Sequence, residues 1–152
     1  MDADTQIGPY RIVRLIGKGG MGAVYEAVHT GIKRRAALKV LQTGLGARPE
    51  FVARLFNEAR AVNLIDHPGI VQATDFGHTG DGTAYLVMEF LKGEPLSASL
   101  QMPFPALCLS DLLTLMRQLA EILHAAHTCG VVHRDACRKH KICPHKGASS
   151  AQ

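Results

Sequence analysis

The chain has 152 residues, of which 47% are hydrophobic and 20% charged, and its formal net charge at pH 7 is +4. This balance is typical of a globular protein and excludes a disordered one, while the length allows one compact domain, or a small domain with part of a second. Aromatic residues make up only 5%, and the basic residues are scattered apart from a run at 138–141. We therefore expect no nucleic-acid partner.

Residues 1–9 are expected to form a leader, which is mostly polar and contains no basic stretch that runs into an apolar one. This composition does not resemble a secretory signal. No apolar run in the chain approaches the about 20 residues that are needed to cross a bilayer. We therefore expect no membrane segment and a cytoplasmic location.

The four cysteines are expected to be reduced thiols in that compartment: Cys108, Cys129, Cys137 and Cys143. A zinc site built from Cys137, His140, Cys143 and His145 is an alternative. The spacing of these residues lacks the paired C-x-x-C pattern of such sites, so we predict no metal site.

The first half of the chain begins with three predicted strands. Residues 10–16 are rich in Ile, Val and Leu and end at a cluster of glycines. Strand-like segments follow at 23–28 and at 35–41, separated by a turn at 30–33. Because the connections are short, we expect an antiparallel meander.

The periodicity then changes from strand to helix and back. Apolar residues recur at helical spacing between Phe51 and Ile65, which predicts a helix of about four turns. The helix is expected to end before Pro68. Two further strands are predicted at 70–76 and 84–90. Five strands and one helix make a small α+β unit.

The second half is predicted to be helical. A short helical piece is expected near 95–100, and a long helix from Ser110, a plausible N-cap, to about Thr128. The long helix is apolar around most of its circumference, so it requires neighbours on most sides. The residues that follow it, 129–152, do not contain enough helix to supply them.

The glycine cluster fits the pattern G-x-G-x-x-G-x-V, which runs from Gly17 through Gly19 and Gly22 to Val24. Glycine lets a backbone approach phosphates closely. A dinucleotide-binding site would need a helix directly after the loop. Here a strand follows, which disfavours that alternative.

Two charged residues interrupt apolar patterns. Lys39 lies within the predicted strand 35–41, and Glu58 lies on the same helical face as Leu55 and Val62. A charge that points into a core is costly unless it is neutralised, so we expect Lys39 and Glu58 to form an ion pair. A purely structural salt bridge, or a lysine that reaches to the surface, remains an alternative.

From about Tyr10 to Asp135 these motifs together resemble a bacterial serine/threonine protein kinase of the membrane-associated eukaryotic-like family. The resemblance implies an α+β fold with a kinase small lobe at 10–91, made of a five-stranded antiparallel sheet and one helix. The first helices of the large lobe would occupy 92–135, up to the His-Arg-Asp motif. Residues 136–152 would be a divergent basic tail.

By this resemblance, the cofactor is ATP, and Gly17, Gly19 and Gly22 cover its phosphates. Lys39 would hold the α- and β-phosphates while it is paired with Glu58. The reaction implied is transfer of the γ-phosphate to serine or threonine hydroxyls of a protein, whose identity the sequence does not reveal.

The resemblance also implies where the rest of the nucleotide binds, at Ile16, Val24, Ala37, Met88, Glu89 and Leu91. Val24 and Ala37 would contact the adenine. Met88 resembles the gatekeeper of the family, and Glu89 and Leu91 would offer backbone groups to the adenine edge.

The catalytic loop is where the resemblance ends. Asp135 stands at the position that orients the substrate hydroxyl and accepts its proton. Cys137 replaces the lysine of the family, and His140 replaces its metal-binding asparagine. Magnesium is expected for the family, but its ligands are missing here, so acceleration of phosphoryl transfer should be largely lost.

The tripeptide Asp75-Phe76-Gly77 spells the magnesium-binding motif of kinases. It precedes the His-Arg-Asp motif instead of following it. We therefore interpret it as a strand that ends in a glycine turn.

Three hypotheses follow for the whole chain. It is a truncated or frame-shifted serine/threonine kinase with little activity, or a pseudokinase-like module that binds nucleotide or protein without catalysis, or a nonfunctional remnant. The abrupt change of composition after Asp135 favours the first or the third, and a frame shift is the preferred cause.

Overall fold

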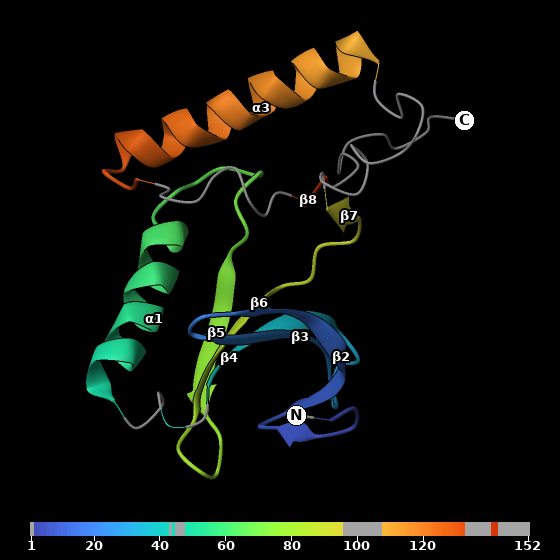
Figure 1. The fold of residues 1–152 in the computed structure, drawn as a ribbon, viewed down its shortest axis with the longest axis vertical. Coiled ribbons are helices and arrows are strands. Elements are labelled where there is room, and N and C mark those ends of the chain that lie inside the picture. The colour runs from blue at the N-terminus through green and yellow to red at the C-terminus, as the bar shows by residue number, and fades with distance from the viewer. Residues whose placement is uncertain (1, 43, 45–47, 96–107, 133–140, 143–152) are drawn as a thin grey trace. The chain divides into compact units, whose positions relative to one another are not determined.

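The computed structural model describes residues 2–42, 44, 48–95, 108–132 and 141–142. The chain divides into two compact units, Met1–Phe90 and Leu91–Gln152. Each unit is described by itself below, and Figure 1 labels the helices and strands.

The first unit is built on a six-stranded antiparallel sheet with the strand order β1-β2-β3-β4-β6-β5 (Figure 1). The strands are β1 (Gln6–Ile7), β2 (Tyr10–Gly19), β3 (Gly22–His29), β4 (Arg35–Leu41), β5 (Ala73–His78) and β6 (Ala84–Glu89). The predicted meander of the first three long strands is present as β2, β3 and β4. The expected α+β class is confirmed.

The sheet has one strand more than the five that the sequence predicted. The additional strand is β1, which pairs with β2 through Gln6 and Ile7 and lies in the segment expected to be a leader. Ile7 is only 1% exposed and belongs to the core. The segment expected to be a leader therefore joins the sheet, and Ile7 is the buried apolar residue that attaches it.

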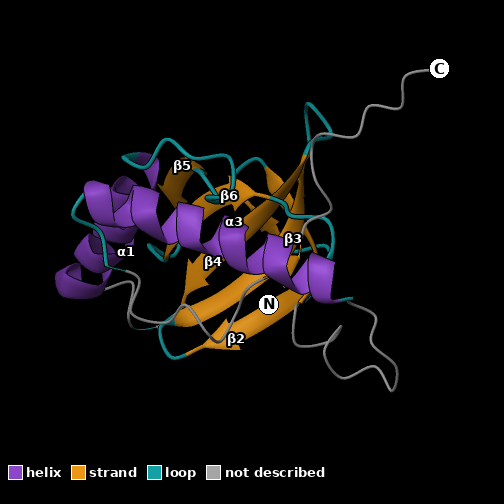
Figure 2. Ribbon diagram, turned by 90° about the horizontal axis from the view of Figure 1, so that it is seen from above, coloured by secondary structure: helices purple, strands orange, loops and turns teal. Residues whose placement is uncertain are grey.

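The helix α1 (Pro49–Asn63) connects β4 to β5 and has Pro49 at its start, a position where the missing N–H of proline costs nothing. It contacts β5 and β6, and Figure 2 shows it beside β5. At its end, the Asn63 side chain donates to the Ala73 carbonyl oxygen at 2.8 Å and accepts from the Ala73 N–H at 2.9 Å. These two hydrogen bonds fix the end of α1 to the start of β5.

The two faces of the sheet carry different apolar clusters. One face holds the larger cluster, with Ile12, Tyr25, Leu38 and Val87 among its members. The other face holds Leu41, Ala84 and Leu86, which pack against Leu55 of α1. Because Leu55 is 2% exposed, this contact is the main apolar attachment of α1 to the sheet.

The second unit contains the long helix α3 (Leu109–Thr128) and the short strands β7 (Glu94–Pro95) and β8 (Lys141–Ile142), which pair antiparallel. Among the described residues, no helix is both long and apolar enough to cross a membrane. The short helical piece expected at 95–100 lies outside the described residues, except for Pro95, which belongs to β7.

The start of α3 differs from the prediction, because its N-cap is Cys108 and not Ser110. The Cys108 backbone N–H donates to Asp111 Oδ2 at 3.2 Å, and the Cys108 thiol donates to the same oxygen at 3.0 Å. These hydrogen bonds lower the pKa of Asp111. The bond from the Cys108 N–H is one arm of a capping box, whose other arm joins the Asp111 N–H to the Cys108 side chain; such a box satisfies backbone groups that the helix itself leaves unpaired.

Candidate functional site

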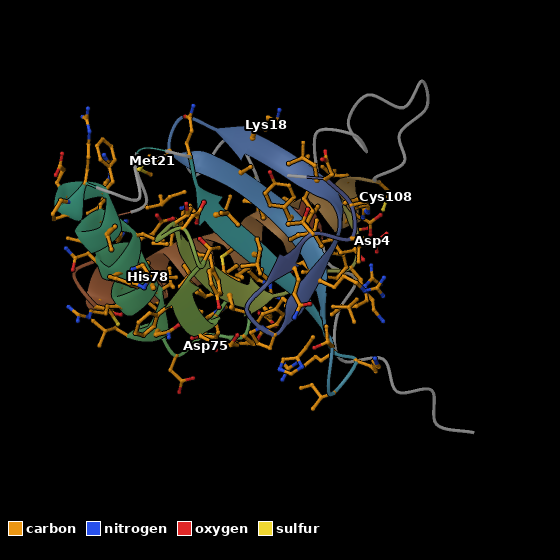
Figure 3. The ribbon with its side chains drawn as sticks, turned by 90° about the horizontal axis from the view of Figure 1, so that it is seen from below. Asp4, Lys18, Met21, Asp75, His78 and Cys108 are labelled. Carbon is orange, nitrogen blue, oxygen red and sulfur yellow. The ribbon has the colours of Figure 1, made fainter. Side chains whose placement is uncertain are left out.

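The glycine cluster forms the tip of the β2–β3 hairpin, where Gly19 pairs with Gly22 across a turn made of Gly20 and Met21. Figure 3 marks Lys18 and Met21 at this tip. The Met21 carbonyl oxygen accepts a hydrogen bond from the Gln42 N–H at 3.0 Å. The turn is therefore fastened to the residue that follows β4.

The glycines of the hairpin are required for different reasons. A Cβ on Gly22 would lie 2.0 Å from the Val40 carbonyl oxygen, so only glycine fits against β4. A Cβ on Gly17 or Gly20 would meet no atom within 4 Å. Packing explains Gly22, whereas the space above Gly17 and Gly20 is open to a ligand.

The strand register brings several of the predicted site residues onto one face of the sheet. Val24 pairs with Lys39, and Ala37 pairs with Met88. Cross-strand partners project to the same side, and residues two apart on a strand do so as well. Val24, Ala37, Lys39 and Met88 therefore share the face that α1 packs against.

Lys39 and Glu58 form an ion pair on this face. The Lys39 Nζ lies 2.8 Å from Glu58 Oε1 and 2.7 Å from Glu58 Oε2. The lysine side chain is 19% exposed and the glutamate side chain 49% exposed. The strand β4 thus supplies a largely buried ammonium group, and α1 supplies the carboxylate that neutralises it.

The remaining predicted residues lie at the ends of the same strands or outside the described residues. Ile16 is half-buried and sits at a register shift of β2, between Leu15 and Gly17. Glu89 is the last residue of β6, and Leu91 is the first residue of the second unit. Asp135 lies outside the described residues, as do Cys137, His140, Cys143 and His145.

The Asp75-Phe76-Gly77 tripeptide lies within β5, which continues to His78. The prediction of a strand at 70–76 that ends in a turn at Gly77 is therefore wrong at both ends, because β5 begins at Ala73 and contains Gly77. A Cβ on Gly77 would lie 2.6 Å from the Tyr85 hydroxyl oxygen, so the glycine makes room for that ring. Asp75 is exposed and accepts a hydrogen bond from the Phe76 N–H at 2.8 Å; Figure 3 marks its position.

A hollow of about 270 Å³ lies in the first unit, and its lining includes Tyr10, His29, Ala36, Asp75 and Val87. Ala36 and Val87 belong to the larger apolar cluster, so the hollow opens on the face away from α1. Burial, followed by the charge of Asp75, raises the pKa of Tyr10. Neither Lys39 nor Glu58 lines this hollow.

The sequence profile of the protein kinase domain matches residues 10–139. The chain belongs to the protein kinase family. Members of this family use ATP and phosphorylate proteins, generally with Mg²⁺.

Proteins similar to this chain include bacterial serine/threonine kinases. The chain is 44% identical over 135 residues to the serine/threonine-protein kinase PknA of Mycobacterium tuberculosis, covering 86% of this chain and 31% of that protein. It is 47% identical over 131 residues to the serine/threonine-protein kinase Pkn1 of Myxococcus xanthus, covering 86% of this chain and 18% of that protein. The chain therefore spans less than a third of the length of these relatives.

Two solved structures have a similar fold. The PknI kinase domain of M. tuberculosis superposes with a TM-score of 0.68 at 31% identity, covering 89% of this chain and 54% of that one. The apo form of PpkA-294 superposes with a TM-score of 0.74 at 26% identity, with the same coverage of 89% and 54%. The expected resemblance to bacterial serine/threonine kinases is thus confirmed.

A paired ammonium group and open backbone lie on neighbouring elements of the described sheet. The ammonium group of Lys39 is fixed by Glu58, and the open backbone at Gly17 and Gly20 lies on the neighbouring hairpin. Within the described part of the chain, no three His, Cys, Asp or Glu side chains gather closely enough to hold a metal ion.

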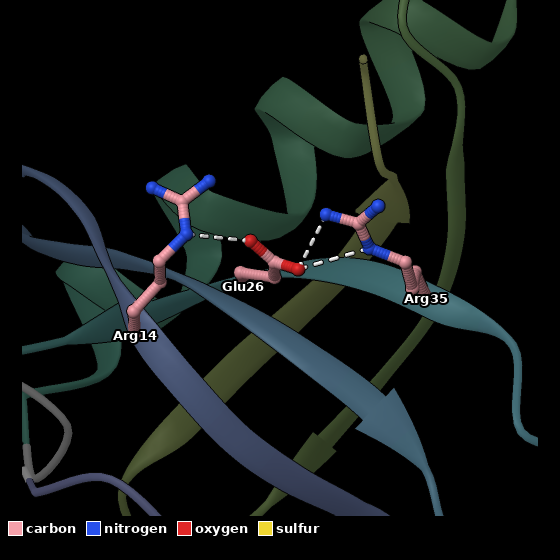
Figure 4. Close-up of polar contacts among 3 residues, drawn as sticks. All are labelled: Arg14, Glu26 and Arg35. Atoms are coloured by element: carbon pink, nitrogen blue, oxygen red, sulfur yellow. Dashed lines mark hydrogen bonds and ion pairs between the residues drawn. The ribbon is translucent and has the colours of Figure 1, made fainter.

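One charged cluster on the α1 face was not predicted from the sequence. Glu26 of β3 forms ion pairs with Arg14 of β2 and with Arg35 of β4, as Figure 4 shows. The Glu26 side chain is only 6% exposed. Glu26 interrupts an apolar strand as Lys39 does, and that interruption is the signal that could have revealed it.

Proposed function

We propose that this chain is the ATP-binding portion of a serine/threonine protein kinase, and that it transfers phosphate to protein hydroxyls weakly or not at all. The observation that carries the proposal is the ion pair between Lys39 and Glu58, on the sheet face next to the glycine hairpin. A lysine in an apolar strand that is fixed by a carboxylate from a neighbouring helix suits a triphosphate ligand.

Lys39 is the residue proposed to hold the α- and β-phosphates. A lysine ammonium group has three N–H donors, and the two oxygens of Glu58 occupy two of them, at 2.7 and 2.8 Å. The third donor remains for a phosphate oxygen. Glu58 thus acts as a positioning residue that sets the direction of this donor.

The adenine would lie between the hairpin and the end of β6. Val24, Ala37 and Met88 supply apolar atoms on the face that carries Lys39, and Ala37 leaves room for a flat ring because its side chain is short. Glu89 and Leu91 would offer backbone groups to the edge of the base, but not the Glu89 N–H, which already donates to the Gln72 carbonyl oxygen at 3.3 Å. The hairpin glycines would let the backbone approach the phosphates.

Weak catalysis is proposed from the sequence around Asp135. Asp135 would orient the substrate hydroxyl, but Cys137 and His140 replace the lysine and the asparagine of the family pattern. Phosphoryl transfer depends on positioning and on neutralisation of charge by metal ions. Loss of a metal ligand therefore removes much of the acceleration.

Nucleotide binding can be tested by titrating the full chain with a fluorescent ATP analogue. A charge-assisted hydrogen bond contributes about 1.5–3 kcal/mol, so Lys39→Ala and Glu58→Ala should each weaken binding by about tenfold or more. Arg11→Ala is a matched control, because Arg11 forms a 2.8 Å ion pair with Asp4 at the other end of the sheet. Equal affinities in all four proteins would remove the case for the site.

Catalysis needs a separate assay of phosphate transfer to protein substrates with magnesium present. We expect negligible turnover. Robust turnover that Asp135→Asn abolishes would contradict the proposal of weak activity.

A pseudokinase-like function is the second candidate, and the replacement of the metal-binding asparagine by His140 favours it. A module that binds nucleotide without catalysis does not require magnesium. Phosphate transfer separates it from a weakly active kinase: binding of the ATP analogue without transfer above the Asp135→Asn background would support it, whereas transfer that Asp135→Asn abolishes would exclude it.

A further inference from the structure

The cluster of Arg14, Glu26 and Arg35 is connected to the residue that ends the first unit. Arg35 Nε and Nη2 both approach Glu26 Oε1, at 2.9 and 2.5 Å, and Arg14 Nε lies 2.8 Å from Glu26 Oε2 (Figure 4). The guanidinium carbon of Arg35 lies 4.1 Å from the ring centroid of Phe90. Glu26 is thus linked through one arginine to Phe90.

This cluster occupies the part of the sheet face next to the proposed adenine position. Glu26 is the cross-strand partner of Ala37. Arg35 precedes Ala37 by two residues on β4, and Phe90 follows Met88 by two residues. Since side chains two residues apart point to the same side, the cluster and the proposed adenine contacts lie on adjacent rungs of one face.

The buried Glu26 carboxylate orients the guanidinium of Arg35, whose side chain is 45% exposed. A buried carboxylate is costly unless it is paired, and the Glu26 side chain is 6% exposed. Two N–H groups of Arg35 converge on one oxygen of Glu26, so the plane of the guanidinium is fixed. That plane then serves as a fixed surface for the Phe90 ring, to which it is attracted by a cation–π interaction.

We propose that Glu26 and Arg35 are positioning residues for adenine recognition. They hold the Phe90 ring against the sheet and thereby fix the backbone on either side of it, which includes Glu89 and Leu91. The inference rests on the proposed function, because it assigns those backbone groups to the adenine edge. It adds residues that touch neither phosphate nor base and yet determine how well the base is bound.

The test compares ATP with inorganic triphosphate by isothermal titration calorimetry on the full chain. Arg35→Lys keeps the charge beside Glu26 but loses the planar guanidinium, and Phe90→Leu keeps an apolar side chain but loses the ring. Each should weaken ATP binding about two- to fivefold and leave the affinity for triphosphate unchanged. The double variant should lose no more affinity for ATP than the single variant that binds ATP more weakly. Both substitutions remove the same interaction between Arg35 and Phe90.

Arg14→Gln is the matched control. Arg14 forms an ion pair with Glu26, as Arg35 does. The guanidinium that lies over the Phe90 ring is that of Arg35. Its loss should leave the affinities for ATP and for triphosphate as they are in the parent chain. A loss of ATP binding in Arg14→Gln as large as in Arg35→Lys would show that the cluster acts only through general stability, and would overturn the inference.

The remaining outcomes separate this inference from the proposed function. If Lys39→Ala weakens binding of both ligands while Arg35→Lys and Phe90→Leu bind ATP as the parent does, the inference is wrong and the nucleotide site stands. If Lys39→Ala also binds both ligands unchanged, the nucleotide site itself is wrong. Equal weakening of ATP and triphosphate by Arg35→Lys or Phe90→Leu would likewise overturn the role in adenine recognition.

Discussion

Replacing Gly22 by alanine should destabilise the first unit, because the new methyl group would collide with backbone and not with a movable side chain. The added Cβ would lie 2.0 Å from the Val40 carbonyl oxygen and 3.0 Å from Leu41 Cα. A relaxed contact between carbon and oxygen is about 3.3–3.6 Å, so β3 and β4 would have to separate by about 1.3 Å at this rung. β4 lies inside the sheet between β3 and β6, which opposes such a shift.

The magnitude follows from two opposing contributions. Overpacking of a well-packed site typically costs about 1–3 kcal/mol. Alanine also reduces the freedom of the unfolded chain, which offsets about 0.4–1 kcal/mol. We expect a net loss of about 1.3 kcal/mol, which corresponds to a fall in melting temperature of roughly 5–10 °C for a unit of this size.

The assay is urea or thermal unfolding of Gly22→Ala beside two controls from the same hairpin. Gly17→Ala and Gly20→Ala would meet no atom within 4 Å, so their stabilities should stay within about 1 kcal/mol of the parent. Gly17→Ala should nevertheless bind the ATP analogue more weakly, if phosphates approach the backbone there. A Gly22→Ala variant as stable as Gly20→Ala would refute the steric argument.

Three further predictions concern charged and titrating groups. A double-mutant cycle of Lys39→Met and Glu58→Gln, measured by urea unfolding, should give a coupling of about 1 kcal/mol for this pair, in which only Glu58 is half-exposed; a coupling of zero would contradict the ion pair. Burial raises the pKa of Tyr85 above the value of about 10 that a tyrosine ordinarily has, so its neutral form contributes stability that is present below pH 10 and lost as the pH rises through the raised pKa. Stability of Tyr85→Phe should therefore fall less steeply above pH 10 than that of the parent, and an identical profile would argue against this role. Asp75→Asn should bind the ATP analogue as the parent does with and without magnesium, whereas a loss confined to magnesium would make Asp75 a metal ligand.

The interrupted apolar patterns predicted one charged pair of the α1 face and missed the other. Lys39 and Glu58 each stand alone in an apolar run, and the helical spacing around Leu55 predicted their ion pair. The expected burial of Glu58 was wrong, because its side chain is 49% exposed. Glu26 interrupts its strand in the same way, but the partner on β2 depends on a register shift between Ile12 and Arg14. Regular alternation would pair Val13 with Glu26, so only the bulge puts Arg14 there, and strand pattern alone does not reveal it.

The leader was misjudged for a related reason. Strand prediction relies on several apolar residues in alternation, and β1 has only two residues, of which Ile7 is buried. Its attachment depends on non-local hydrogen bonds, such as those from the Asp4 N–H to the Ile12 carbonyl and from the Ile12 N–H to the Thr5 carbonyl, both at 2.9 Å. These contacts follow from the position of β2 in space, which the composition of residues 1–9 does not encode.

The two carboxylates on the α1 face, Glu58 and Glu26, differ in how readily water reaches them. This difference suggests different roles for their ion pairs in recognition. The two carboxylates differ in exposure, 49% for Glu58 and 6% for Glu26, while their cationic partners differ the other way, 19% for Lys39 and 45% for Arg35. Water therefore reaches the Glu58 carboxylate more readily than the Glu26 carboxylate. Under the proposed function, the phosphate end of the site is therefore adjustable and the base end fixed. A ligand that recruits Lys39 need only reorganise a half-hydrated pair, whereas a ligand that displaces Phe90 would leave a buried carboxylate poorly paired.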